Sequence, residues 1–321
     1  MEGDFYPVYL PGKNAEEILE WFSERIASRE DVEMNHAEPD TLQRRLEELE
    51  DIISPRGSAL VAFSGGVDSS LALAVAARAL PKDRVLAVTS NNETYLPSEL
   101  DLARGFVESL GVEHLVVNTR ELDNPNYASN PTNRCYFCKS TLYSDLARLA
   151  EERGYACVVD GANKDDEGDY RPGRKAAKEL GVVSVLSEAG VTKAEVRELA
   201  KHLDLPTWDK PALACLSSRF PYGQEITPEK LLQVTRAEEF LRREGFRQVR
   251  LRHHGEIARL EVGPEELERA FAMREEISAE LLDAGFLYVT LDLAGYRPGS
   301  LNAALRQPGK KAKKTLPILS S

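Results

Sequence analysis

The feature that most constrains the fold is an alternation of short apolar runs with longer helical segments, which begins at Ala59. The apolar runs are rich in β-branched residues and cover residues 60–63, 85–89, 114–118 and 156–160. Segments of helical pattern follow them, for example residues 69–80 and 98–110. Strands that alternate with helices predict βαβ units and a parallel sheet. We therefore expect an α/β fold that binds its ligands beyond the carboxyl ends of these strands.

The rest of the chain predicts three further parts around this α/β domain. We expect a helical extension over residues 1–55, the α/β domain over 56–222, an α+β domain over 223–305 and a basic tail over 306–321. In the extension, helices are predicted over residues 15–27 and 41–53. In the smaller domain, the order helix, strand, strand, helix, strand is predicted over residues 228–244, 248–253, 257–262, 264–284 and 287–293.

Charge and hydropathy exclude several classes of protein. The 41 basic and 53 acidic residues give a net charge of −12, which disfavours broad binding to nucleic acid. No apolar run approaches the ~20 residues of a membrane span, and the first residues lack a signal-peptide pattern, so we expect a cytoplasmic protein. Four cysteines are too few for a disulfide scaffold in a chain of 321 residues, so catalytic or metal-binding thiols are expected.

A glycine-rich loop follows the first predicted strand and precedes a helix. It comprises Ser64, Gly65, Gly66, Val67, Asp68, Ser69 and Ser70. Glycines allow successive N–H groups to turn inward, and the helix N-terminus adds its positive dipole end, so the loop predicts a phosphate site. Asp68 suits such a site if Mg²⁺ bridges it to the phosphates. The motifs of P-loop enzymes and of dinucleotide-binding folds are absent, and a plain tight turn would not need three hydroxyls and a carboxylate.

This loop resembles the PP-loop of the ATP pyrophosphatase superfamily, which includes GMP synthetase, NAD synthetase and tRNA-thiolating enzymes. The resemblance implies that the loop binds the β,γ-pyrophosphate of ATP and that a substrate oxygen attacks the α-phosphorus, forming an adenylate. It also implies that residues 88–91, with Ser90 among them, line the adenine and ribose pocket, and that Gly161 lies near the nucleotide.

Three cysteines form a second candidate site. Cys135 and Cys138 make a CxxC motif, and Cys215 lies far away in the sequence. Three thiolates leave structural zinc one ligand short. The same set suits a [4Fe–4S] cluster with one iron free of protein ligands. A redox disulfide, sulfur-carrier chemistry and unrelated thiols remain open at this point. Cys157, within an apolar run, is predicted to be a small core residue.

From residue 60 to about residue 301, a series of motifs resembles the LarE family of ATP-dependent sulfur transferases in nickel-pincer cofactor synthesis. The motifs are residues 160–166 (Asp-Gly-Ala-Asn-Lys-Asp-Asp), 169–173 (Asp-Tyr-Arg-Pro-Gly), 188–193 (Glu-Ala-Gly-Val-Thr-Lys), 208–212 (Trp-Asp-Lys-Pro-Ala) and 218–223 (Ser-Arg-Phe-Pro-Tyr-Gly). The resemblance implies adenylation of a carboxylate of pyridinium-3,5-biscarboxylic acid mononucleotide and its conversion to a thiocarboxylate. It further implies a homo-oligomer and a sulfide donor that the sequence does not identify.

The family has two sulfur sources. In one, a single cysteine five residues before the arginine of the Ser-Ser-Arg-Phe-Pro-Tyr-Gly segment gives up its own sulfur. In the other, a CxxC and a cysteine near that segment hold a cluster. Here Cys215 stands four residues before Arg219 and Ala214 stands five before it, so the pattern favours a cluster held by Cys135, Cys138 and Cys215.

The substrate of such an enzyme carries a phosphate and carboxylates, so the pocket needs local positive charge. Candidates are Ser218 and Arg219, and the pair Arg250 and Arg252, which are two apart on a predicted strand and so point the same way. Arg259 on the partner strand is a further candidate. A solvated sheet face is the alternative for this pair.

Four acidic residues are further candidates. Glu238 resembles an acidic residue near the active site of the family, and an exposed helix charge is the alternative. Asp160, Asp165 and Asp166 are candidates to bind Mg²⁺ or to orient the pyridinium, and a polar loop is the alternative for them.

Two rival functions are a tRNA thiolase and a nucleotide-sensing binding protein. The first calls for a basic RNA-binding surface, against which the net charge argues. The second would bind ATP without releasing pyrophosphate.

Overall fold

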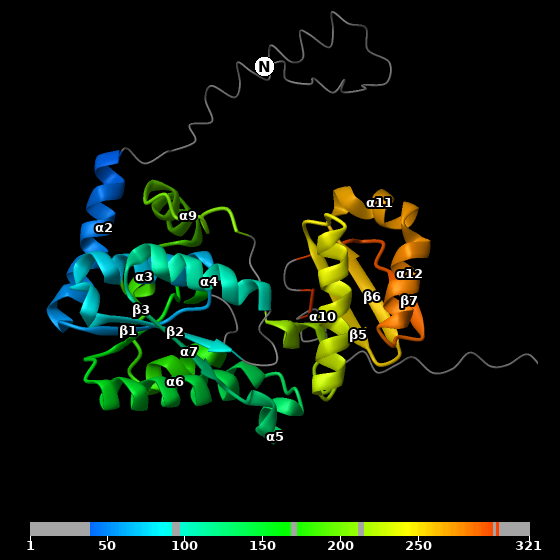
Figure 1. Ribbon diagram of the computed structural model, residues 1–321, viewed down its shortest axis with the longest axis horizontal. Helices are drawn as coiled ribbons and strands as arrows, with labels where there is room; N and C mark the ends of the chain where they lie inside the picture. Colours follow the sequence, from blue (N-terminus) through cyan, green and yellow to red (C-terminus); the bar gives the residue numbers. More distant parts are fainter. Residues whose placement is uncertain (1–38, 92–96, 168–171, 211–214, 298–299, 302–321) are drawn as a thin grey trace, which may run out of the picture. The chain divides into compact units, whose positions relative to one another are not determined.

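A computed structural model describes residues 39–91, 97–167, 172–210, 215–297 and 300–301 (Figure 1). The first described helix, α2 (Pro39–Ile53), confirms the helix predicted over residues 41–53. The helix predicted over residues 15–27 and the basic tail lie outside the described residues. In the described part of the chain, no helix is long and apolar enough to span a bilayer.

The four predicted strands form one parallel sheet in the order β3-β2-β1-β4. Their bounds are β1 (Ala59–Ala62), β2 (Val85–Asn91), β3 (Glu113–Asn118) and β4 (Val158–Val159). Nearly all of β1 and the first five residues of β2 are buried, which explains their continuous apolar sequence. The predicted α/β fold is confirmed.

Helices cover both faces of this sheet (Figure 1). Those on one face are α3 (Val67–Ala79) and α4 (Pro97–Leu110), and those on the other are α6 (Arg134–Arg153) and α7 (Pro172–Glu179). The remaining helices in this part are α5 (Pro125–Ala128), α8 (Val185–Glu188) and α9 (Lys193–His202). Tyr143 and Leu146 of α6 pack on Leu60 and Val88 of the sheet, so the α6 face is a closed apolar layer.

A separate three-stranded sheet follows, in the order β5-β6-β7. Its elements are α10 (Pro228–Arg243), β5 (Val249–His254), β6 (Ile257–Val262), α11 (Leu267–Ala272), α12 (Arg274–Asp283) and β7 (Tyr288–Leu291). β5 and β6 pair antiparallel, as the predicted hairpin requires, and β7 pairs parallel to β6. The single helix predicted over residues 264–284 is instead broken at Met273, whose backbone (φ −89°, ψ 19°) leaves helical geometry between α11 and α12.

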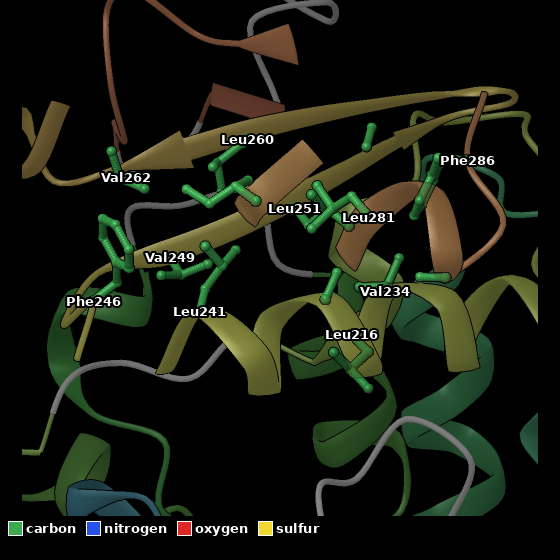
Figure 2. Close-up of a cluster of buried hydrophobic side chains, with 14 of the residues drawn as sticks. Leu216, Val234, Leu241, Phe246, Val249, Leu251, Leu260, Val262, Leu281 and Phe286 are labelled. Carbon is green, nitrogen blue, oxygen red and sulfur yellow. The ribbon is translucent and has the colours of Figure 1, made fainter. Parts of the chain in front are cut away.

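The core of this second part lies between α10, α12 and the sheet (Figure 2). Val249 and Leu251 of β5 point into it, while Arg250 and Arg252 alternate with them and point to the other face. Leu216 and Phe220, which come before α10 in the sequence, are also buried in this core. The segment that carries Cys215 is therefore anchored by its apolar side chains.

We predict that Leu281→Ala lowers the free energy of unfolding by about 2–5 kcal/mol, because it leaves a cavity in a core where Leu281 is fully buried. Its neighbour Leu282 in the same helix is 48 % exposed, so Leu282→Ala should change stability by less than about 0.5 kcal/mol. Urea unfolding followed by circular dichroism measures both. Equal losses would contradict this description of the core.

Candidate active site

The glycine-rich loop has the backbone that an anion site needs. Gly65 adopts a left-handed conformation (φ 73°), and Gly66 is the extended N-cap residue of α3. The Ser69 hydroxyl accepts a hydrogen bond from Ser64 N (3.2 Å) and donates one to Gly66 O (3.1 Å). Ser70 is fully buried, and its hydroxyl has no hydrogen-bond partner among the described residues. The loop is thus closed on itself at the N-terminus of α3.

The end of β4 packs directly on this loop. A Cβ atom added to Gly161 would lie 2.6 Å from Ser69 N and 2.8 Å from Asp68 C, so only glycine fits there. Two residues further on, the Asn163 amide donates to Asp68 Oδ1 (2.9 Å). Gly161 thus contacts the backbone of the loop, and its proximity to a bound nucleotide stays a prediction.

Two lysines from distant parts of the chain contact the loop. Lys193 Nζ donates to Asp68 Oδ2 (2.5 Å). Lys210 Nζ donates to Gly65 O (3.0 Å) and forms an ion pair with Glu99 of α4. Both lysines lie in the sequence motifs described above, but sequence reasoning gave them no role.

Ser90, the candidate for the nucleoside pocket, lies near the end of β2 beside β3. Its hydroxyl shares a hydrogen bond of 2.6 Å with Thr119 Oγ1, which in turn donates to Glu121 Oε1 (2.8 Å). This places hydroxyls at the carboxyl end of the sheet, where ligands bind in such folds.

The three acidic candidates after β4 face different groups. Asp160 accepts from Tyr143 Oη (2.7 Å) and Ala162 N (3.1 Å). Asp165 accepts from the Lys193 backbone N–H, and Asp166 from that of Asn163. Asp68, rather than this group, is the carboxylate nearest the loop backbone.

The CxxC motif opens helix α6. Cys135 and Cys138 are three positions apart in its first turns, so they lie on one side of the helix. Cys215 precedes a 3₁₀ turn over Leu216–Arg219. As whole residues, Cys135 and Cys215 are exposed and Cys138 is half-buried. Cys157 stands apart: it is half-buried, and its S–H donates to Ser58 O.

Buried hydrogen bonds hold the Cys215 segment against α5 and α6. Tyr127 Oη and Ser217 Oγ share a hydrogen bond of 2.5 Å. Arg134 Nη1 donates to Ser217 O (3.0 Å) and to the side-chain oxygen of Asn130. The Asn130 amide donates to Pro221 O (2.8 Å). This network explains how a cysteine 77 positions after Cys138 is brought to the CxxC motif.

The thiols influence one another electrostatically. Burial, Cys215 and Cys135 raise the pKa of Cys138 to about 12, although Lys139 opposes this. For Cys215, desolvation by the surrounding protein opposes ionisation, but Arg134, hydrogen bonds from Ser217 and the charge of Arg219 outweigh it and lower its pKa. Cys215 is thus the thiol that this environment favours as a thiolate.

The three thiols are not grouped around a single metal ion, and the cluster expected from the sequence stays a prediction. The described residues contain no group of three or more His, Cys, Asp or Glu side chains placed to hold one metal ion. The thiolates of a cluster bind different irons, so they need not converge on one point. Three neighbouring thiols without a histidine or carboxylate ligand match a cluster in chemistry.

Lys139 follows the CxxC motif directly and interacts with Cys138, Tyr143 and Asp160, and sequence reasoning missed it. Its ammonium is 5.1 Å from the centre of the Tyr143 ring. Tyr143, Cys138 and Asp160 raise the pKa of Lys139, against the effect of burial, so it remains a cation. Its position directly after the CxxC motif was the signal that could have found it.

Arg219 and Glu238 form a buried ion pair. Arg219 is 1 % exposed and Glu238 is fully buried, so the alternative of an exposed helix charge for Glu238 is wrong. Arg219 donates from Nε to Oε1 (2.7 Å) and from Nη2 to Oε2 (2.8 Å). Arg242 and the Leu251 backbone N–H also donate to Glu238, so this carboxylate holds Arg219 in place. Arg219 Nη1 in turn donates to Ser218 Oγ (3.1 Å).

The strand arginines belong to the same cluster. Arg250 and Arg252 are 7 % and 6 % exposed, so the alternative of a solvated sheet face is wrong. Burial and the charge of Arg219 lower the pKa of Arg250, which stacks on Tyr296. Arg252 donates to Glu261 Oε2 (2.8 Å) and to Ser218 O (2.8 Å).

Arg259 is the outermost arginine of this group. It is half-exposed and bonds to Glu261 and Asp292. The site therefore has a basic region beside the Cys215 segment, in a chain with a net negative charge.

Sequence comparisons show which known proteins this chain is similar to. The family model for NAD synthase matches residues 41–132. A Synechocystis protein described as uncharacterized protein slr1717 is 48 % identical over 82 % of this chain and 99 % of its own length. The pyridinium-3,5-bisthiocarboxylic acid mononucleotide synthase of Lactiplantibacillus plantarum is 41 % identical over 76 % of this chain and 89 % of its own. An uncharacterized Methanocaldococcus jannaschii protein, MJ0830, is 29 % identical over 74 % of this chain.

Gly161→Ala should destabilise the protein by about 1–3 kcal/mol, because the new methyl group overlaps the backbone of Ser69. Gly105→Ala is the matched control, since a Cβ there meets nothing within 4 Å and alanine favours the helix. Thermal unfolding of the two variants measures the difference. A Gly161→Ala protein as stable as the wild type would contradict the close contact between β4 and the loop.

The alkylation of Cys215 should persist to lower pH than that of Cys138. The pKa of Cys215 lies below the ordinary cysteine value, so its thiolate survives as the pH falls, whereas Cys138 stays protonated up to about pH 12. Iodoacetamide labelling of the reduced, iron-free protein between pH 6 and 9, read by mass spectrometry at each cysteine, tests this. Identical pH profiles at the two cysteines would contradict it.

Proposed function

The chain belongs to the pyridinium-3,5-bisthiocarboxylic acid mononucleotide synthase (LarE) family of ATP-dependent sulfur transferases, and from this premise we propose its reaction. It adenylates a carboxylate of pyridinium-3,5-biscarboxylic acid mononucleotide and converts it to a thiocarboxylate. Its sulfur is delivered as sulfide at a [4Fe–4S] cluster that Cys135, Cys138 and Cys215 would hold. The observation that carries the proposal is the buried network that ties the Cys215 segment to the CxxC helix.

In the first step, the loop residues 64–70 bind the β,γ-pyrophosphate through backbone N–H groups and the N-terminus of α3. Bound Mg²⁺ supplies charge neutralisation there, and Asp68 is the carboxylate that would hold it. A substrate carboxylate oxygen attacks the α-phosphorus, the bond to the bridging oxygen breaks, and pyrophosphate leaves. The product is an acyl-adenylate.

The arginine cluster binds the substrate in this proposal. Arg250 and Arg252 contact the mononucleotide phosphate, with Ser218, Arg219 and Arg259 around it. Glu238 contributes by fixing Arg219, because its carboxylate already accepts hydrogen bonds from two arginines and a backbone N–H. It acts as a positioning residue rather than as an acid or base.

In the second step, a sulfur nucleophile attacks the acyl carbon and AMP leaves. Cys135, Cys138 and Cys215 would hold a [4Fe–4S] cluster, which would supply an iron able to bind the sulfide for transfer. Lys139 contributes a fixed positive charge between the thiols and Asp160, which favours charge developing on the acyl oxygen and the departing phosphate. One of the three thiols, Cys215, and one arginine of the cluster, Arg219, lie on the same short segment, residues 215–219.

The test separates adenylation from sulfur transfer. Anaerobic wild-type protein should release pyrophosphate only when both ATP and the pyridinium substrate are present, and should form thiocarboxylate when sulfide is supplied. Cys135→Ser, Cys138→Ser and Cys215→Ser should keep pyrophosphate release within about threefold of the wild type and lose thiocarboxylate formation by at least about 100-fold. Cys157→Ser is the control and should retain both activities.

Thiocarboxylate formation that survives in the Cys135 and Cys138 variants would contradict the three-thiol proposal. Release of pyrophosphate without the pyridinium substrate, or none at all, would contradict the proposed substrate. A single turnover that removes sulfur from Cys215 would assign self-sacrifice to that residue.

A further inference from the structure

The nucleotide loop carries a cation of its own. Lys193 Nζ lies 2.5 Å from Asp68 Oδ2, although the two residues are 125 positions apart. Asp68 is the carboxylate that the proposed function gives to Mg²⁺. The lysine therefore stands where that ion would bind.

The two oxygens of Asp68 have different partners. Oδ1 accepts from the amide of Asn163, which is 4 % exposed and held by its own contacts in the segment after β4. Oδ2 accepts from the ammonium of Lys193, and the side chains of this pair are 34 % and 27 % exposed. The amide contact is fixed by packing, whereas the ammonium is within reach of solvent and can be exchanged.

The second lysine at the loop differs in this respect. The Lys210 and Glu99 side chains are only 16 % and 17 % exposed, and Arg197 donates to the Lys210 backbone carbonyl (2.9 Å). Lys210 also donates to Gly65 O, so it supports the loop backbone. Lys193 is thus the more exposed of the two, and its ammonium stands on a flexible four-carbon stem.

Helix stability does not explain why a lysine stands at the first position of α9. It is the first residue of α9, where the helix dipole disfavours a cation. The start of the helix is fixed without its side chain, by the capping box of Thr192 and Glu195 and by the bond from Lys193 N to Asp165 Oδ2 (2.8 Å). The backbone of Lys193 is therefore anchored while its ammonium can move.

We propose that Lys193 is an exchangeable counterion of Asp68. When ATP binds, Mg²⁺ replaces Lys193 at the Asp68 carboxylate, and the ammonium of Lys193 moves to contact the β,γ-phosphates. This inference rests on the proposed function of the loop as the ATP site. In the free protein the carboxylate is neutralised by the lysine. In the complex Mg²⁺ neutralises it, and the lysine adds a further positive charge to the pyrophosphate that will leave.

This exchange couples the metal to the nucleotide. Without ATP, a divalent cation must displace Lys193 with no new partner for the ammonium, so it binds weakly. With ATP, the ammonium gains the phosphates, and both ligands bind better. The cation therefore strengthens ATP binding, and ATP strengthens cation binding by the same factor.

The experiment measures Mn²⁺ binding without nucleotide by electron paramagnetic resonance, and Mg²⁺·ATP binding by calorimetry without the pyridinium substrate. Lys193→Met should tighten Mn²⁺ binding about tenfold and weaken ATP binding about tenfold, within the range of coupled sites. Lys193→Arg should keep ATP binding within about threefold of the wild type, because it retains the charge. Lys178→Met, an exposed lysine of α7, is the control and should change neither.

Opposite shifts in the two affinities of Lys193→Met, with Lys193→Arg near the wild type, would support the exchange. Lys193→Met that leaves Mn²⁺ binding unchanged or weaker would overturn it, even where the wild type binds ATP normally and the proposed function stands. A wild-type protein that binds no ATP would overturn the proposed function, and the exchange with it.

Discussion

The arrangement of the site depends on one buried network around Arg134 and Asn130. Asn130 adopts a left-handed backbone (φ 54°) and is fully buried, with its side chain bonded to Arg134 and to the carbonyls of Phe220 and Pro221. Buried hydrogen bonds that involve a charged group contribute about 1.5–3 kcal/mol each, and an unpaired partner costs as much. This network leaves the Cys215 segment little freedom to leave the CxxC helix.

The Cys215 segment also contacts the core beside α10 and carries an arginine of the basic cluster. Its apolar side chains, Leu216 and Phe220, are buried in the core beside α10, while Arg219 is held by Glu238. On the other side, Lys139 links the thiols to Asp160, and Gly161 touches the nucleotide loop. The residues proposed for activation, substrate binding and sulfur transfer are thus connected through these buried contacts and electrostatic interactions.

The local sequence pattern was enough to predict the parallel sheet and the face that two of the arginines share. The alternation of strands and helices predicted the parallel sheet, because strands buried on both faces need continuous apolar runs. The period of two along β5 predicted that Arg250 and Arg252 share a face. Contacts between distant residues were not predictable in this way. Nothing near Lys193 in the sequence indicates its contact with Asp68. The burial of Glu238 follows only from the packing of α10 on β5.

The central claim is that the three thiols form one centre that passes sulfur to the activated carboxylate. The most direct measurement gives anaerobically reconstituted protein ³⁵S-sulfide together with ATP and the pyridinium substrate, and follows both the label and the mass of the intact chain. The account predicts labelled thiocarboxylate over repeated turnovers and an unchanged chain. Unlabelled product, with one sulfur missing from Cys215, would contradict it.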